Sequence, residues 1–139
     1  MTAIPLILDV DTGIDDALAL MYACASPEVD LIAATTLMGN VGVDQTTENT
    51  LAVLELCGRT DVEVARGASQ PLVRDHQAFP VVHGERGLGR AELPPASRPI
   101  SNRDATRLLV ESAHERPGEI LLVATGPLTN IALALAQEP

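Results

Sequence analysis

Residues 4–22 read IPLILDVDTGIDDALALMY, and this stretch decides the fold class. Residues 4–10 form a short, nearly continuous apolar run, which is typical of a strand buried on both faces of a sheet. After Gly13, apolar residues recur with the spacing of one helical face, at Ile14, Ala17, Leu18, Met21 and Tyr22. The stretch therefore predicts a buried strand that leads directly into an amphipathic helix.

The rest of the chain repeats this alternation of strand and helix. The expected strands cover residues 31–37, 62–65 and 120–124, and the expected helices cover residues 44–56, about 101–113 and 128–137. Strands that alternate with helices form a parallel sheet with right-handed crossovers. We therefore predict an α/β protein with a mostly parallel open sheet, flanking helices and a Rossmann-like architecture.

Residues 67–100 interrupt the alternation. Five prolines and four glycines in this segment disfavour regular structure. The segment exceeds the limit of ~12–15 residues for ordinary loops, so it is functional, mobile or partly misassigned.

Composition excludes several classes of function. Nineteen acidic residues against nine arginines give a net charge of -10, which repels phosphate backbones and anionic membranes. One Phe, one Tyr and no Trp leave no aromatic surface for stacking bases. No apolar run is long enough to span a membrane, and no signal peptide opens the chain. We expect a cytoplasmic protein without nucleic-acid or membrane partners, in which Cys24 and Cys57 are reduced core residues.

Four carboxylates lie at the end of the first predicted strand: Asp9, Asp11, Asp15 and Asp16. Ligands of open parallel sheets bind beyond the carboxyl ends of the strands, which is where this cluster lies. Like charges about 4 Å apart repel by roughly 4 kcal/mol, whereas a helix dipole offsets only ~0.3–1 kcal/mol per carboxylate. Either some of these carboxyls are protonated or hydrated, or a hard cation such as calcium or magnesium lies among them.

Other interpretations of the acidic cluster explain less of it. Helix capping by Asp11 and Asp15 would account for isolated residues but not for four carboxylates at one strand end. An EF-hand loop requires glycine at its sixth position and Glu at its twelfth, where this chain has Ile14 and Leu20. A magnesium-dependent phosphatase of the haloacid dehalogenase type would use Asp9 as its nucleophile. That alternative stays open, although Gly13 stands where its D-x-D-x-T/V pattern has Thr or Val.

Four motifs in order resemble the inosine-uridine preferring nucleoside hydrolase family. Residues 9–17 (DVDTGIDDA) are similar to its D-x-D-x-G-x-D-D-A motif, and residues 36–41 (TLMGNV) to its second-strand turn. Residues 82–89 (VHGERGLG) resemble its H-G-x-x-G-x-G loop, and residues 123–131 (VATGPLTNI) its T-G-x-L-T-N segment. The resemblance implies that residues 1–139 are the N-terminal part of a single nucleoside hydrolase domain. Residues 67–100 would then be a long irregular loop near the active site.

The family implies hydrolysis of the N-glycosidic bond of ribonucleosides to ribose and free nucleobase, with one calcium ion in the site. By position, Asp11 would ligate calcium and act as general base on the calcium-bound water. Asp16 would be a bidentate calcium ligand, and Thr125 would contribute its backbone carbonyl. Asp15 would bind the ribose 2′- and 3′-hydroxyls, while Asn40 would orient water and sugar and so serve both catalysis and binding.

The roles of three further residues are defined less specifically. Asp9 resembles a supporting acid, and His83, near the nucleobase, is a candidate for catalysis and for substrate binding. Asn130 is interpreted as a structural residue that organises the turn at Thr125. The family also implies a homo-oligomer, either a dimer or a tetramer. Two alternatives stay open: a catalytically inactive metal- or ribose-binding remnant, and a half-subunit completed by another chain.

Overall fold

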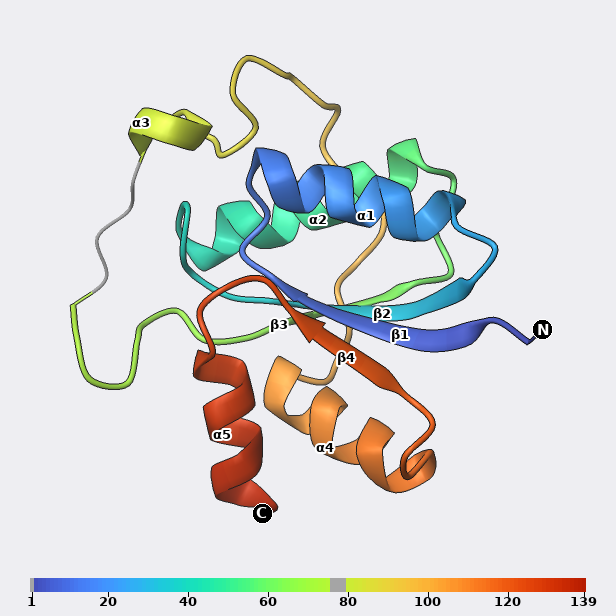
Figure 1. The fold of residues 1–139 in the computed structure, drawn as a ribbon. Coiled ribbons are helices and arrows are strands. Elements are labelled where there is room, and N and C mark those ends of the chain that lie inside the picture. The colour runs from blue at the N-terminus through green and yellow to red at the C-terminus, as the bar shows by residue number, and fades with distance from the viewer. Residues whose placement is uncertain (1, 76–79) are drawn as a thin grey trace.

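The structure is a computed structural model that describes residues 2–75 and 80–139. Its strands are β1 (Ile4–Val10), β2 (Val29–Thr36), β3 (Glu63–Arg66) and β4 (Leu121–Ala124), and its helices are α1 (Ile14–Ala25), α2 (Val43–Leu56), α3 (Pro80–His83), α4 (Ala105–Glu115) and α5 (Thr129–Gln137). The strands pair in parallel in the order β3-β2-β1-β4 (Figure 1). The prediction of an α/β fold with an open parallel sheet is confirmed. Within the described ranges, no helix is both long and apolar enough to cross a membrane.

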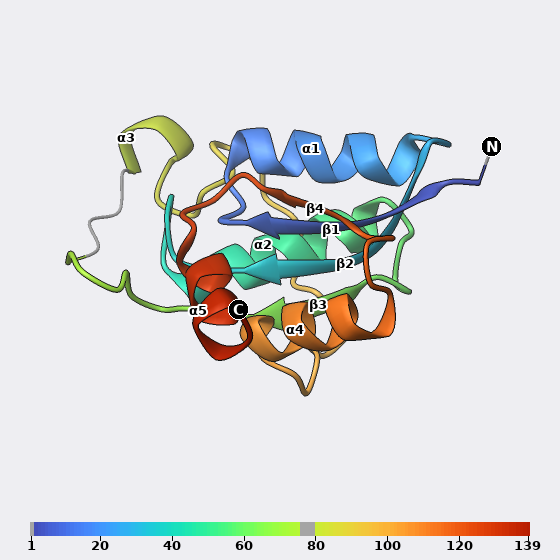
Figure 2. The same cartoon turned by 60° about the horizontal axis from the view of Figure 1, so that its bottom comes forward.

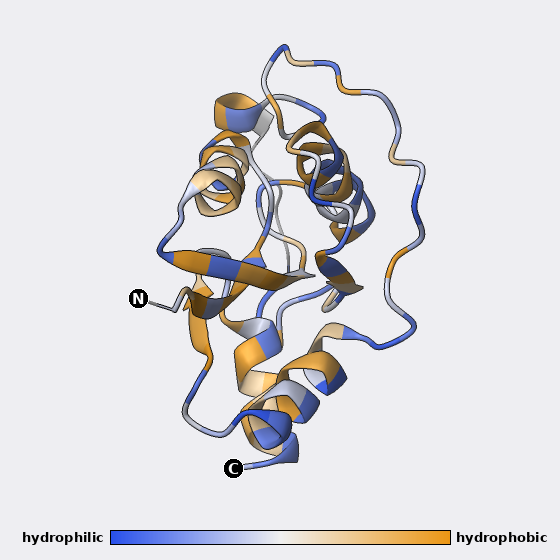
Figure 3. Cartoon of the chain, turned by 90° about the vertical axis from the view of Figure 1, so that its right-hand side faces the viewer, coloured by the Kyte–Doolittle hydropathy of each residue, from blue (hydrophilic) through white to orange (hydrophobic). Residues whose placement is uncertain are grey.

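Helices cover both faces of the sheet and define two hydrophobic cores. Helices α1 and α2 lie on one face, and α4 and α5 lie on the other (Figures 1 and 2). Successive residues of a strand point to opposite faces, so Leu8 packs in the core with Leu20 and Leu54, while Ile7 packs with Leu108. Figure 3 shows the apolar strands between the two helical layers. The apolar run at residues 4–10 is thus explained by burial on both sides.

The segment between β3 and α4 contains one element among the residues that the structure describes, the short helix α3. The sequence predicted no regular structure there, but a proline is compatible with the first turn of a helix, which lets residues 80–83 form one turn. Residues 76–79 of this segment lie outside the described residues. Helix α4 begins at Ala105 rather than near residue 101, because the Asp104 side chain accepts the Arg107 N–H (2.8 Å) and caps the helix there.

The two cysteines lie near the end of α1 and just after α2. The thiols of Cys24 and Cys57 are free and half-buried, and both residues pack against the core under these helices. Burial and, to a smaller extent, the neighbouring Cys57 raise the pKa of the Cys24 thiol to about 11. Cys24 is therefore a protonated thiol at neutral pH.

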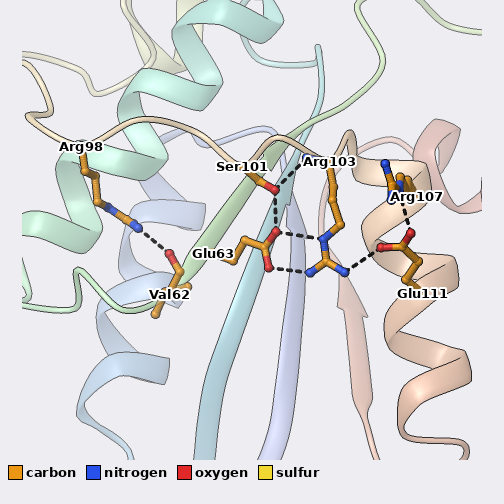
Figure 4. A network of polar contacts seen from close by, with 7 residues as sticks. All are labelled: Val62, Glu63, Arg98, Ser101, Arg103, Arg107 and Glu111. Carbon is orange, nitrogen blue, oxygen red and sulfur yellow. Dashed lines mark hydrogen bonds and ion pairs between the residues drawn. The ribbon is translucent and has the colours of Figure 1, made fainter.

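A polar segment closes the β3 edge of the sheet. The Ser101 N–H donates to the carbonyl of Val64 on β3 (2.7 Å), so the chain before α4 runs along this edge. Figure 4 shows Arg103 between Glu63 of β3 and Glu111 of α4. Its guanidinium donates to Glu63 Oε1 and to Glu111 Oε2, each at 3.0 Å. Arg103 therefore links β3 to α4 through charge-assisted hydrogen bonds.

Replacing Arg103 should cost more stability than replacing the arginine one turn later. We expect Arg103→Met to lower the free energy of unfolding by about 1–3 kcal/mol, because it leaves Glu63 and Glu111 without their shared cation. Arg107→Met removes only an exposed i,i+4 pair with Glu111 and should cost less than about 0.5 kcal/mol. Urea unfolding of both variants measures the difference. Equal losses would contradict the linking role of Arg103.

The β4 edge of the sheet is open and apolar. Leu121 and Leu122 are 44% and 41% exposed, although they lie on a strand of the central sheet. Beside them, an apolar hollow of about 370 Å³ is lined by side chains from β4, α4 and α5, including Leu109, Ile131 and Leu135. The two edges therefore differ, with a charged segment along β3 and bare apolar surface along β4.

Candidate active site

Residues after three strands meet at the carboxyl edge of the sheet. Asp11 follows β1, Asn40 follows β2 and Thr125 follows β4. The Asn40 N–H donates to Asp11 Oδ2 (2.7 Å), and the Thr125 N–H donates to the carbonyl of Asp9 on β1 (2.9 Å). Parallel strands bring their carboxyl ends to one edge, so residues far apart in the sequence contact one another here.

The carboxylate of Asp11 is enclosed by the loops at this edge. It is 7% exposed, and the Asn40 side chain also donates to the Asp11 backbone carbonyl (3.1 Å). A Cβ at Gly39 would overlap Asp11 Oδ2, and a Cβ at Gly126 would lie 3.0 Å from Asp11 Oδ1. Burial, together with the smaller effect of the charges of Asp16 and Asp15, raises the pKa of Asp11 to about 6, against the lowering effect of the Asn40 hydrogen bond. Asp11 is therefore a confined, weakly acidic group.

Asp16 joins the start of α1 to the end of β4. Its Oδ2 accepts the Gly13 N–H (3.1 Å), and its Oδ1 accepts the Thr125 hydroxyl (2.6 Å). Capping of α1 by Asp11 and Asp15 is therefore not observed, because Asp16 accepts the hydrogen bond at the helix start. Thr125 contacts this cluster through its hydroxyl as well as through its backbone.

Asp9 is fully buried within the sheet end. Its Oδ1 accepts hydrogen bonds from the Thr35 hydroxyl (2.5 Å) and from Asn130 Nδ2 (2.8 Å), while its Oδ2 has no hydrogen-bond partner among the residues that the structure describes. Burial raises the pKa of Asp9, against these two hydrogen bonds. Asn130 also donates to the Thr36 carbonyl (3.1 Å) and accepts the Ala68 N–H (2.9 Å). The Asn130 side chain thus links β1, β2 and the start of the long segment, and its hydrogen bonds do not go to the Thr125 turn that the sequence analysis assigned to it.

Asp15 and His83 meet at the outer side of the same edge. The Asp15 side chain is 80% exposed, and its Oδ1 lies 3.8 Å from His83 Nδ1. The Ile14 N–H donates to His83 Nδ1 (3.1 Å), and a Cβ at Gly13 would lie only 2.5 Å from that nitrogen. His83 is therefore brought from the long segment onto the first turn of α1.

The four carboxylates do not form the single cluster that the sequence predicted. Asp9 is held inside the sheet end by Asn130, and Asp15 points to solvent. In the described part of the chain, no three acidic, histidine or cysteine side chains converge as a metal-binding group. What the structure brings together is the smaller oxygen set of Asp11, Asp16 and Thr125.

Polar residues of α2 support this edge, and the sequence analysis did not identify them. Asn49 Nδ2 donates to the Thr12 carbonyl (3.1 Å), and the Thr50 and Thr12 hydroxyls are hydrogen-bonded (2.6 Å). The signal available in the sequence was a run of short polar residues, Thr46-Thr-Glu-Asn-Thr50, within a predicted helix. In the structure, all of these residues except Glu48 are buried. Buried polar side chains require partners, so such a run marks loops held by side chains.

Comparison with known proteins identifies the family of this chain. The sequence profile described as inosine-uridine preferring nucleoside hydrolase matches residues 6–139. The chain belongs to this family. As a nucleoside hydrolase relative, it is 43% identical over 134 residues to "Uridine nucleosidase 1" of Arabidopsis thaliana, covering 96% of this chain and 40% of that protein. It is 50% identical over 132 residues to "Pyrimidine-specific ribonucleoside hydrolase RihA" of Photobacterium profundum, covering 95% and 43%.

Solved structures of nucleoside hydrolases share the fold. The purine-preferring ribonucleoside hydrolase from Gardnerella vaginalis superposes with a TM-score of 0.93 at 39% identity, over 97% of this chain and 44% of that one. The plant nucleoside hydrolase PpNRh1 also gives a TM-score of 0.93, at 40% identity, over 98% and 43%. The chain therefore spans less than half the length of these relatives.

Proposed function

We propose that this protein hydrolyses the N-glycosidic bond of ribonucleosides and releases ribose and a free nucleobase. The observation that carries the proposal is Asp11, a buried carboxyl with its pKa raised to about 6, beside Asp16 and Thr125. A general base works best when its pKa lies near the working pH. The named relatives act on pyrimidine ribonucleosides in one case and prefer purine ribonucleosides in another, so the proposal covers ribonucleosides as a class.

The donor set fits calcium as the cofactor. Asp11 and Asp16 offer carboxylate oxygens, and Thr125 would offer its backbone carbonyl, which is the oxygen chemistry that calcium prefers. Neither carboxylate has an ion-pair partner among the described residues, so a cation would offset their mutual repulsion. Bound calcium would supply a Lewis acid that orients a water and lowers its pKa.

The neighbouring side chains would position the sugar and the proton acceptor. Asp11 would take the proton of the attacking water, with Asn40 holding its carboxylate in place. The exposed carboxylate of Asp15 would accept hydrogen bonds from the ribose hydroxyls, and His83 beside it would contact the nucleobase end. Asp9 would support the Thr125 turn through its backbone carbonyl. Negative charge around the sugar would stabilise the oxocarbenium-like transition state of the reaction.

The alternatives receive different support from the geometry. A phosphatase with Asp9 as nucleophile requires an accessible carboxylate, whereas Asp9 is fully buried and bonded to Thr35 and Asn130. An inactive metal- or ribose-binding remnant fits the same site, because Asp11, Asp16 and Thr125 provide only part of a calcium shell. A half-subunit completed by another chain is consistent with the open apolar edge at Leu121 and Leu122.

Association of several copies is part of the proposal. The edge strand β4 exposes apolar side chains and unpaired backbone groups, and such edges favour association. A homo-oligomer, dimer or tetramer, would cover this surface. Light scattering on the sample used for the activity assay measures the number of copies.

Ribose release tests the proposed activity. We expect this chain to release ribose from one or more of inosine, uridine, adenosine and cytidine with calcium present, and to lose that activity with excess chelator. Asp11→Ala should reduce the rate at least ~100-fold, because the general base and a ligand are removed. Asp44→Ala is the matched control, since Asp44 is exposed and forms an ion pair with Arg66 on the surface. Absence of release would favour the inactive remnant or the half-subunit, and release that survives Asp11→Ala would place the activity elsewhere.

A further inference from the structure

Helix α2 has a polar face that is buried rather than exposed. Thr46, Thr47, Asn49 and Thr50 are each at most 5% exposed. Three of them form hydrogen bonds with residues at the ends of β1 and β2. The Thr46 hydroxyl donates to the Leu37 carbonyl (2.8 Å). The hydroxyls of Thr47 and Thr36 are hydrogen-bonded to each other (2.6 Å), as are those of Thr50 and Thr12 (2.6 Å). Asn49 differs from its neighbours because it also reaches the long segment that carries His83.

Asn49 bridges two backbone carbonyls that are far apart in the sequence. Its Nδ2 donates to the carbonyl of Thr12 (3.1 Å), next to Asp11, and to the carbonyl of Arg86 (2.8 Å), three residues after His83. Its Oδ1 accepts from Gln45 Nε2 (2.9 Å), which fixes the orientation of the amide. A Cβ at Gly87 would lie 2.9 Å from Asn49 Nδ2, so the segment passes directly over this side chain.

We propose that Asn49 is a positioning residue that holds His83 against the start of α1. It ties the loop of Asp11 and the loop of His83 to one amide group, and thereby sets the distance between the imidazole and the acidic residues. The consequence for nucleoside binding rests on the proposed function. The positioning itself concerns contacts present in the protein without substrate.

His83 needs an anchor outside its own helix. Helix α3 has four residues, which is too short to be stable alone. The chain after it turns through Gly84, Gly87 and Gly89, all with positive φ, so the backbone there has wide conformational freedom. The Ile14 N–H bond to His83 Nδ1 (3.1 Å) holds the imidazole itself, and Asn49 holds the backbone after it, at Arg86.

The chemistry of an amide suits this position. Two carbonyl acceptors require a group with two N–H donors, which Asn has and Asp lacks. The anchored imidazole accepts the Ile14 N–H at Nδ1, so a neutral His83 carries its hydrogen on Nε2. By holding the imidazole against the Ile14 N–H, Asn49 would thus keep the ring's hydrogen-bond donor at Nε2.

Amide exchange in the free protein tests the positioning. Asn49→Asp should speed hydrogen exchange at the Ile14 amide about tenfold or more, although Asn49 does not contact Ile14, and should speed tryptic cleavage after Arg86. Thr50→Val is the matched control, because it removes a buried bond to Thr12 and leaves Arg86 anchored. Its Ile14 exchange should stay within about twofold of the parent. If Asn49→Asp does not fold, Asn49→Ala removes the same donors without placing a carboxylate against two carbonyls.

A double-mutant cycle separates positioning through His83 from general loosening. In a His83→Ala background the Ile14 amide has already lost its acceptor, so Asn49→Asp should add no further exchange at Ile14. An equal increase in both backgrounds, or no increase in either, would overturn the proposal. These measurements need no substrate. Failure of the ribose-release assay would therefore count against the proposed function alone, and failure of the cycle against Asn49 alone.

Discussion

Metal-free protein should become more stable as the pH falls from 7 to 5, and Asp11→Asn should weaken this trend while stabilising the protein at pH 7. The pKa of Asp11 is about 6 in the folded protein, against 3.8 for an ordinary carboxyl. The folded state therefore binds a proton at a higher pH than the unfolded state does. The stability that this proton contributes is fully present below pH 4 and is lost as the pH rises through 6. At roughly 1.4 kcal/mol per pKa unit, the full loss from below pH 4 to well above pH 6 is at most about 3 kcal/mol, and the range from pH 5 to 7 covers roughly half of it.

Two other carboxyl groups with shifted pKa values contribute to the pH dependence. Burial raises the pKa of Asp9 too, which acts in the same direction. The hydrogen bond from Arg103 lowers the pKa of Glu63, so the stability contributed by Glu63 is lost only as the pH falls through a value below 4.5. The difference in slope between the parent protein and Asp11→Asn therefore reports on Asp11.

Urea unfolding in chelator at pH 5, 6 and 7 measures the trend. The matched control is Asp44→Asn, which removes an exposed carboxylate and should leave the slope unchanged. Bound calcium should reverse the trend. The cation binds the ionised carboxylates, and protons compete with it for these groups as the pH falls. A flat profile for the parent protein would contradict the burial of Asp11.

The sequence predicted the sheet because β1 and β2 are short apolar runs between periodic helices. It also predicted which loops meet, since Asp11, Asn40 and Thr125 each follow a predicted strand. These features depend on local periodicity and on the geometry of parallel strands, which are visible in one chain. The α/β fold class and the approximate element bounds were therefore predictable.

Side-chain direction at the site was not predictable in the same way. Asp9 and Asp11 are two residues apart, yet Asp9 is bonded to Asn130 and Asp11 to Asn40. The partner of each carboxylate comes from a segment far away in the sequence, so spacing alone cannot assign it. The same holds for Asn49, whose two acceptors lie at Thr12 and Arg86.

Replacing Gly39 by alanine should disrupt the site more than any other single added methyl group on this loop. The new Cβ would overlap Asp11 Oδ2 and lie 2.5 Å from Asp11 Cγ. The carboxylate cannot withdraw, because the Asn40 N–H holds Oδ2 (2.7 Å) and Gly126 is packed against Oδ1. The loop must open instead. We expect the free energy of unfolding to fall by about 2–4 kcal/mol and any calcium affinity to fall by about 10–100-fold.

Gly42→Ala is the matched control for this substitution, because a Cβ there meets no atom within 4 Å. Gly42 is the N-cap of α2, so the control should cost less than about 1 kcal/mol. Unfolding in urea and calcium titration by calorimetry compare the two variants. The pH profile adds a readout tied to Asp11 itself: once the loop opens, that carboxyl is hydrated, and the slope between pH 5 and 7 should shrink in Gly39→Ala but persist in Gly42→Ala. Equal behaviour of the two variants would mean that Asp11 is not confined by Gly39, and its raised pKa would then need another cause.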